Sequence, residues 1–200
     1  ASVNLSLDTI DREKFKAITY RDEFDRVMKT FNLLLENEIP VKVNAVVMEG
    51  KNTDDILPMI ALTKDHDVAV RFIEEMPFNG GSHSPTLTWT YKKILEHITD
   101  SHPDVGKRSR EEFGTSDNYR IPGYRGSFGI IAAFSRTFCG TCNHIRVTAQ
   151  ERLKSCLYDT GVLDIRSLMR SGLDDEQIKV AMSEAFQHRS ENGFQAEQKR

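Results

Sequence analysis

The sequence contains no apolar run that approaches the roughly 18 residues of a membrane-spanning helix, so we expect no membrane span. Residues 1–8 predict a strand with no basic stretch before it, which is not the pattern of a secretory signal peptide. Only three cysteines occur among 200 residues, all between Cys139 and Cys156. This odd, clustered set argues against a secreted disulfide scaffold and favours a metal or reactive site in a reducing compartment, which we expect to be the cytoplasm.

Charge is unevenly distributed along a chain whose composition, 38% hydrophobic and 28% charged, is typical of a globular protein. Residues 105–156 hold nine basic and four acidic side chains, a net charge of +5, although the whole chain carries −3. This basic stretch is either the binding region of a small anionic ligand near the cysteines or a solvated surface. It lacks interleaved aromatic residues, so nucleic acid is not a favoured partner.

The first hundred residues alternate between strand and helix patterns, which predicts parallel βα units. The expected strands are 3–8, 41–48 and 68–74, and the expected helices are 22–38, 53–66 and 88–99. Each strand alternates apolar and polar residues, so that Lys42 and Arg71 lie on faces opposite their apolar neighbours. A polar strand face needs water or a ligand. The pattern therefore predicts part of a barrel-like parallel sheet with helices outside and a polar lumen.

The second hundred residues show a different pattern of predicted elements, and we expect a domain boundary near residue 101. Residues 101–129 resemble a loop; short strands follow at 129–134, 144–148 and 153–156, and helices at 164–170 and 174–189. The sequence thus predicts βα units over 1–100 and a smaller α+β part that carries the cysteines over 101–200. The loop Pro77–Pro85 follows the third strand at its carboxyl end, where barrel sites lie.

The cysteine spacing indicates a metal or cluster site. Two residues, one of them a glycine, separate Cys139 from Cys142, and thirteen residues separate Cys142 from Cys156. Soft thiolates select zinc or an iron–sulfur cluster. Structural zinc requires a fourth ligand, such as His144 or His188. A four-iron cluster held by three cysteines leaves one iron open for substrate. Three ordinary buried thiols are the alternative without a ligand.

Four sequence blocks together resemble one enzyme family. They are SVNLSLDTID, VKVNAVVMEGKNTDDI, VRFIEEMP and FCGTCNHIRVTAQERLKSCLYD, in this order. They are similar to the radical S-adenosylmethionine (SAM) GTP 3′,8-cyclases, which begin molybdenum-cofactor biosynthesis. The resemblance covers nearly the whole chain. It implies an internal or C-terminal fragment: the C-terminal part of an incomplete parallel βα barrel followed by a small α+β extension that binds a cluster.

The resemblance also implies ligands and partners. In this family a first [4Fe–4S] cluster cleaves SAM and an auxiliary [4Fe–4S] cluster binds GTP. The first-cluster motif Cys-x3-Cys-x2-Cys is absent here, so we do not expect this fragment to be active alone. The implied partners are GTP, SAM and a reducing electron donor; a homodimer is one assembly to test.

The resemblance also implies roles for individual residues, through their positions in the matching blocks. The cluster ligands are Cys139, Cys142 and Cys156; the SAM contacts are Ser6 and Met76; the GTP contacts are Lys42, Arg71, His144, Ile145 and Arg146. Two positions depart from the family pattern. His144 stands where the family usually has arginine, and residues 149–151 are Ala-Gln-Glu where a glycine commonly turns the hairpin.

Two other functions fit parts of the pattern. One is a radical-SAM peptide-modifying enzyme with an auxiliary cluster, although such enzymes usually carry longer, cysteine-richer extensions. The other is a zinc-stabilised binding module without catalytic activity. The iron content of the purified protein would distinguish the zinc-stabilised module from both classes of enzyme.

Overall fold

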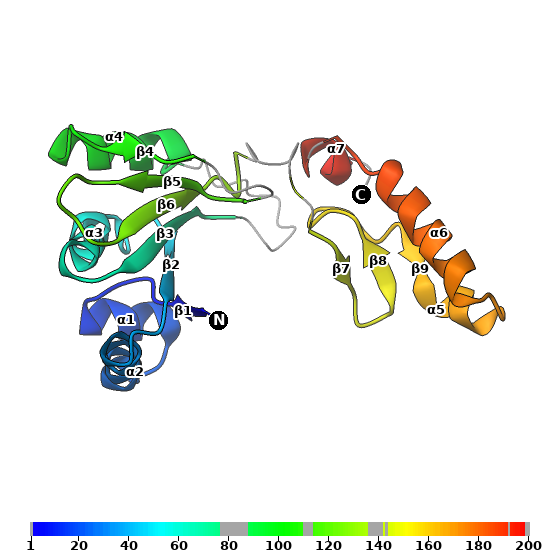
Figure 1. The fold of residues 1–200 in the computed structure, drawn as a ribbon, viewed down its shortest axis with the longest axis horizontal. Helices are drawn as coiled ribbons and strands as arrows, with labels where there is room; N and C mark the ends of the chain where they lie inside the picture. Colours follow the sequence, from blue (N-terminus) through cyan, green and yellow to red (C-terminus); the bar gives the residue numbers. More distant parts are fainter. Residues whose placement is uncertain are drawn as a thin grey trace. The chain divides into compact units, whose positions relative to one another are not determined.

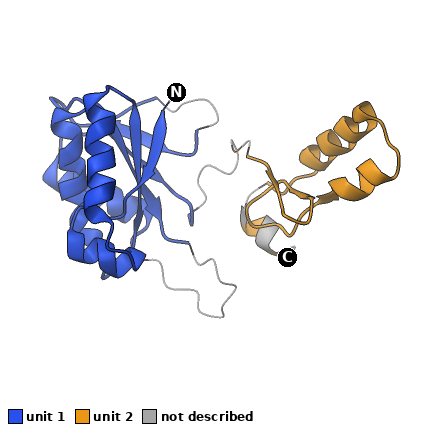
Figure 2. Ribbon diagram, turned by 90° about the horizontal axis from the view of Figure 1, so that it is seen from below, with its two compact units in different colours: residues 1–135 blue, residues 136–200 orange. Residues whose placement is uncertain are grey.

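The computed structural model describes residues 2–76, 88–109, 114–135, 142, 144–191 and 193–198. The chain divides into two compact units, residues 1–135 and 136–200 (Figure 2). Cys139 and the Pro77–Pro85 loop, both singled out in the sequence, lie outside the described residues. In the described part of the chain, no helix has the length and apolar character needed to cross a membrane.

The first unit is built on a six-stranded, largely parallel sheet (Figure 1). In spatial order its strands are β1 (Val3–Ser6), β2 (Val41–Val47), β3 (Val68–Glu74), β6 (Ser127–Ile131), β5 (Asp117–Arg120) and β4 (Gly106–Lys107). The first four strands are parallel, and β5 and β4 extend the sheet in antiparallel fashion. This arrangement confirms the predicted α/β class with a parallel-dominated sheet.

Helices cover one face of this sheet and share a single hydrophobic core with it. They are α1 (Arg12–Thr19), α2 (Phe24–Glu36), α3 (Ile56–Asp65), which follows the 3-10 turn η1 (Thr53–Asp55), and α4 (Tyr91–Ser101). Phe31 of α2, Ile60 of α3 and Ile94 of α4 are fully buried beside Val43 and Val70 of the strands. Burial of these apolar side chains is the main contribution to the stability of the unit.

Three local expectations for this unit differ from the structure. Helix α1 was not predicted; it begins at the cap Asp11, whose side chain accepts a hydrogen bond from Lys14 N. The helix expected over 53–66 begins only at Ile56, because Thr53–Asp55 form the 3-10 turn that precedes it. The loop expected over 101–129 was wrong, because β4 and β5 form there by pairing with each other and with β6.

The second unit is a three-stranded antiparallel sheet with short helices. Its elements are β7 (Arg146–Val147), β8 (Arg152–Lys154), β9 (Leu163–Asp164), α5 (Ile165–Arg170), α6 (Asp175–Gln187) and α7 (Gly193–Gln198). Asp164 caps α5, and Asp174 caps α6 in a reciprocal capping box with Gln177. In the β7–β8 turn, Glu151 adopts the left-handed region with φ 62°, a conformation that glycine adopts without strain.

The compact units do not coincide with the division expected at residue 101. Strands β5 and β6 pair with each other, and β6 also pairs with β3, so residues up to 135 pack with the βα units. The second unit therefore begins only at residue 136.

Candidate functional site

A row of polar positions crosses the sheet face opposite the helices. The strand register aligns Ser6 with Asn44, Asn44 with Arg71, and Arg71 with Gly129, while β5 places Asn118 across from Gly129. Their sequence neighbours on the strands point into the hydrophobic core, so these five positions share the other face. Side chains at register partners on one face lie close enough to touch a common ligand.

Lys42 lies on the same face, in the adjacent row. It aligns with Asn4 on β1 and with Ala69 on β3, and its side chain is half-buried. The structure thus brings together on one sheet face three residues that the sequence assigned to ligands: Ser6, Lys42 and Arg71. Their ligand roles stay predictions.

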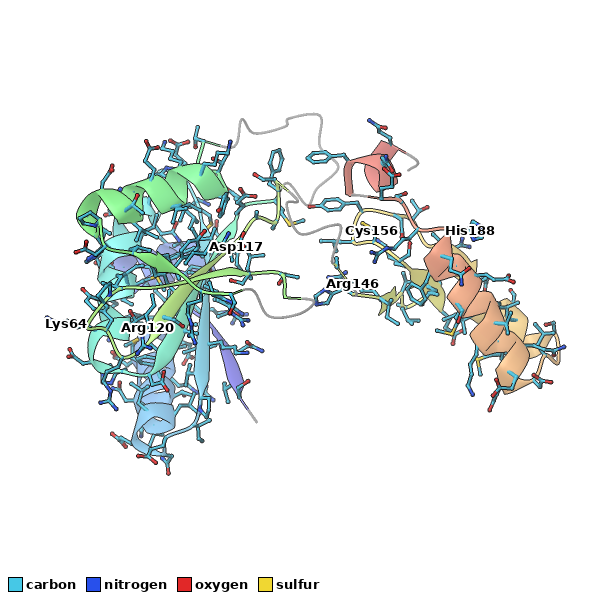
Figure 3. All side chains as sticks on the ribbon, turned by 45° about the horizontal axis from the view of Figure 1, so that its top comes forward. Lys64, Asp117, Arg120, Arg146, Cys156 and His188 are labelled. Carbon is cyan, nitrogen blue, oxygen red and sulfur yellow. The ribbon has the colours of Figure 1, made fainter. Side chains whose placement is uncertain are left out.

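Three buried polar atoms on or beside this row lack a hydrogen-bond partner. Among the described residues they are Asn44 Oδ1, Arg71 Nε and Ser116 Oγ. Ser116 immediately precedes β5, which runs from Asp117 to Arg120, both labelled in Figure 3. Folded proteins pair nearly all buried polar groups, so a local group of unpaired ones indicates a place for a ligand or water.

The carboxyl end of β3 is held by a buried carboxylate. Glu74 is only 1% exposed, and its oxygens accept hydrogen bonds from Tyr91 N at 2.5 Å and from Ser135 N and Ser135 Oγ at 2.6 Å each. Tyr91 is the first residue of α4, where the helix dipole favours a negative charge. Met76, the expected SAM contact, is half-buried and lies two residues beyond this anchor.

In the second unit, Cys142 and Cys156 lie at the same end of the β7–β8 hairpin. Cys142 precedes β7 and Cys156 follows β8, so both flank the open end of the hairpin, opposite the turn. Cys156 is labelled in Figure 3. Both are free, half-buried thiols. Cys142 Sγ lies 3.5 Å from Nδ1 of His144. This half-buried thiol pair suits a soft metal or cluster.

Asp159 fixes the loop that carries Cys156. Its carboxylate accepts hydrogen bonds from Cys156 N at 2.8 Å, Gly161 N at 2.9 Å and Ser155 Oγ at 3.1 Å. The sequence analysis missed this residue. An aspartate three positions after a cysteine, followed two residues later by glycine, is the local signal that indicates such a side-chain turn.

Arg189, just beyond α6, holds the loop of the other thiol. Its Nη1 donates a hydrogen bond to the carbonyl oxygen of Cys142. The two residues are 47 positions apart, and nothing local in the sequence signals the pairing. His188, weighed above as a fourth zinc ligand, has its Nδ1 2.8 Å from the carbonyl oxygen of Glu184 in its own helix.

Three of the expected GTP contacts lie at the start of β7: two precede the strand, and Arg146 is its first residue. His144, Ile145 and Arg146 are all exposed. Arg146 faces Lys154 across the hairpin, so two cationic side chains stand near the cysteines on neighbouring strands. An exposed guanidinium in this position is available for bidentate hydrogen bonds to an anion such as phosphate.

Comparison with known proteins gives consistent matches. Residues 68–195 match the sequence profile of the family described as Molybdenum Cofactor Synthesis C. The chain is 37% identical to a GTP 3′,8-cyclase of Chlorobaculum tepidum, with 97% of this chain and 59% of that protein aligned. It is 38% identical to molybdenum cofactor biosynthesis protein 1 of Bos taurus, with 89% of this chain and 28% of that protein aligned.

A third relative is the molybdenum cofactor biosynthesis protein moc-5 of Caenorhabditis elegans, which is 37% identical over 94% of this chain and 31% of its own length. The chain therefore spans about three fifths of the bacterial relative and about a third or less of the two animal relatives.

Proposed function

This chain belongs to the Molybdenum Cofactor Synthesis C family, and on that premise we propose that it is the C-terminal part of a radical-SAM GTP 3′,8-cyclase. The whole enzyme would convert GTP to 3′,8-cyclo-7,8-dihydro-GTP, the first step of molybdopterin biosynthesis. The observation that carries the proposal is the pair of thiols at the open end of the β7–β8 hairpin, with Arg146 on the same hairpin.

The fold supports a finer assignment within the same proposal. Strands β1, β2, β3 and β6 are parallel, have helices on one face and a polar row on the other, as a segment of an incomplete βα barrel requires. The boundary expected near residue 101 gives way here: we assign residues 1–135, which include β6, to that barrel segment and residues 136–200 to an auxiliary extension that binds cluster and substrate. The SAM-cleaving cluster would be held by a part of the enzyme outside this chain, and the reducing electron donor would be a separate partner.

The donor set around the hairpin fits an iron–sulfur cluster. Cys142 and Cys156 would hold it together with Cys139, since these are the three cysteines of the chain. When bound, a four-iron cluster with three protein ligands supplies one iron at which a donor atom of the substrate can bind. Asp159 and Arg189 orient the two loops through hydrogen bonds to the backbone, which do not engage either thiol.

The remaining side chains would bind and orient the substrates. Arg146, with His144 and Ile145 beside it, is assigned to GTP because its exposed guanidinium matches a phosphate. Lys42 and Arg71 are assigned to GTP because they place positive charge on the polar sheet face. Ser6, which ends β1 on that face, and Met76, beyond β3, are assigned to SAM.

Reconstitution without oxygen tests the cluster assignment. Purified chain supplied with iron and sulfide should turn brown, absorb broadly in the visible range and hold about four irons. Cys156→Ser should abolish the absorption, whereas Ser183→Ala on the exposed surface of α6 should not change it. A colourless protein that holds one zinc per chain would contradict the proposal and support the zinc-stabilised module.

Substrate binding is tested on the same reduced, reconstituted sample. Addition of GTP should perturb the electron-paramagnetic-resonance spectrum of the cluster, and Arg146→Ala should raise the GTP concentration needed for that change. An unchanged spectrum at saturating GTP would remove the substrate assignment and leave the cluster assignment standing.

A further inference from the structure

One side chain of the second unit contacts a cysteine at the sulfur itself. Nδ1 of His144 lies 3.5 Å from Sγ of Cys142, within the range of a hydrogen bond to sulfur. The two supports described above reach only the backbone of the cysteines. Asp159 accepts a hydrogen bond from Cys156 N, and Arg189 donates one to a carbonyl oxygen. Of these three side chains, His144 is therefore the one that contacts an atom expected to bind the cluster.

The chemistry of the cysteine decides which partner donates the hydrogen bond. A cysteine that holds a cluster is a thiolate, so its sulfur offers lone pairs only. A neutral imidazole has one N–H and one acceptor nitrogen, and their partners decide which nitrogen carries the proton. With Sγ of Cys142 as the acceptor, Nδ1 of His144 carries the proton. Nε2 of the neutral ring is then an acceptor, which does not pair with a phosphate oxygen.

Direct coordination by His144 is the other arrangement that fits this distance, since two ligands of one tetrahedral metal are separated by a similar length. The proposed function decides between the two arrangements. A four-iron cluster with three cysteine ligands keeps its fourth iron for the substrate, and a histidine on that iron would block it. The ring is also exposed beside the sulfur. These points favour a hydrogen bond to the ligand sulfur over a bond to iron.

We propose that His144 is a positioning residue for the auxiliary cluster, whose Nδ1–H donates to the sulfur of Cys142 and makes the cluster easier to reduce. The inference rests on the proposed function, which supplies the cluster. Reduction adds negative charge, and a hydrogen bond to a ligand sulfur stabilises that charge. The resemblance implies a substrate contact at this position, where the family usually has arginine. In this chain the histidine acts on the cluster through Cys142.

The test is the reduction potential of the reconstituted chain, measured without GTP by a redox titration followed by electron paramagnetic resonance. His144→Ala removes the donor. His144→Asn keeps an N–H close to the position of Nδ1, because both nitrogens are attached to Cγ. His144→Gln places its amide nitrogen one bond further from the backbone. The matched control is His66→Ala, which removes an exposed histidine of the first unit.

We expect His144→Ala to lower the reduction potential. Loss of one hydrogen bond should change the ratio of reduced to oxidised cluster by about 3- to 10-fold at a fixed potential. That change corresponds to about 30 to 60 mV for a one-electron couple. His144→Asn should restore most of the difference, whereas His144→Gln should not, and His66→Ala should match the unmodified chain. The iron content should be the same in every variant, because His144 is not a ligand.

Other results would overturn the inference. If His144→Ala holds the cluster at an unchanged potential, the inference is wrong and the proposed function stands; weaker GTP binding by that variant would then assign the ring to the substrate. Equal potentials for His144→Asn and His144→Ala would contradict a donor at Nδ1. A strongly coupled nitrogen in pulsed spectra that disappears in His144→Ala would make His144 an iron ligand. If the unmodified chain holds no iron–sulfur cluster, the proposed function fails and the inference fails with it.

Discussion

Glu74→Gln tests how the first unit secures the carboxyl end of its third strand. The Glu74 carboxylate accepts three hydrogen bonds, from Tyr91 N, Ser135 N and Ser135 Oγ. Glutamine has nearly the same shape but keeps only one acceptor oxygen, and its NH2 group then faces a backbone N–H. One bond to a charged acceptor is lost, and one buried N–H is left without a partner.

The size of the effect follows from these losses. A hydrogen bond to a charged group contributes about 1.5 to 3 kcal/mol, and an unpaired buried N–H costs about 1 to 3 kcal/mol. Removal of a buried charge offsets part of this loss. We therefore expect the free energy of unfolding to fall by about 2 to 3 kcal/mol, which corresponds to a thermal midpoint roughly 5 to 10 °C lower.

Tryptophan fluorescence during urea denaturation measures this change in the correct unit, because the single tryptophan, Trp89, lies just before α4. The matched control is Glu75→Gln, which alters the neighbouring, half-buried carboxylate. Hydrogen exchange should also accelerate at the amides of Tyr91 and Ser135. If Glu74→Gln unfolds at the same urea concentration as the control, the three hydrogen bonds do not secure the strand end and the reasoning is refuted.

Three further predictions concern other parts of the chain. Gly126→Ala should lower the free energy of unfolding by about 1 to 3 kcal/mol in urea denaturation, because the added Cβ would overlap backbone atoms of β3; an unchanged midpoint would contradict this. Burial raises the pKa of Asp8 above its ordinary 3.8, so its stabilising contribution is present below that pH and lost as the pH rises through the raised value. Asp8→Asn should therefore melt higher than the unmodified chain at pH 7 and match it below pH 3.8; an equal advantage at both pH values would refute the burial argument. Asp159→Ala should reduce the iron bound per chain by loosening the loop of Cys156, whereas Asp175→Ala should not, and equal iron contents would argue against that role.

Much of the first unit was predictable because its signals are local. The alternation in β2 and β3 placed Lys42 and Arg71 opposite their apolar neighbours, and the structure has them there. Alternation with a period of two can be recognised within a single strand, without knowledge of the strands that pair with it. Strand β5 was missed because it is four residues long and is defined by its pairing with β6. Short strands stabilised by tertiary pairing leave little periodicity to detect.

In the cysteine-bearing unit too, features set by neighbouring residues could be predicted, whereas contacts between residues far apart in the sequence could not. Cysteine spacing predicted a shared site, and the structure places Cys142 and Cys156 at one end of a hairpin. The hairpin turn departs from the family's glycine, yet Glu151 adopts the left-handed conformation that a glycine commonly provides. The contact between Arg189 and the backbone of Cys142 joins residues 47 positions apart, which a local pattern does not predict.

The two sides of the first sheet differ in how their buried polar groups are hydrogen-bonded. On the core side, the buried Glu74 carboxylate accepts hydrogen bonds from Tyr91 N, Ser135 N and Ser135 Oγ, so protein donors pair both of its oxygens. On the polar side, the atoms of Asn44, Arg71 and Ser116 are buried without partners in the described part of the chain. A fold that satisfies a full carboxylate in its core has the means to pair three lesser groups as well. Unpaired polar groups at neighbouring positions therefore mark the polar sheet face as a place where water or a ligand completes the hydrogen bonds.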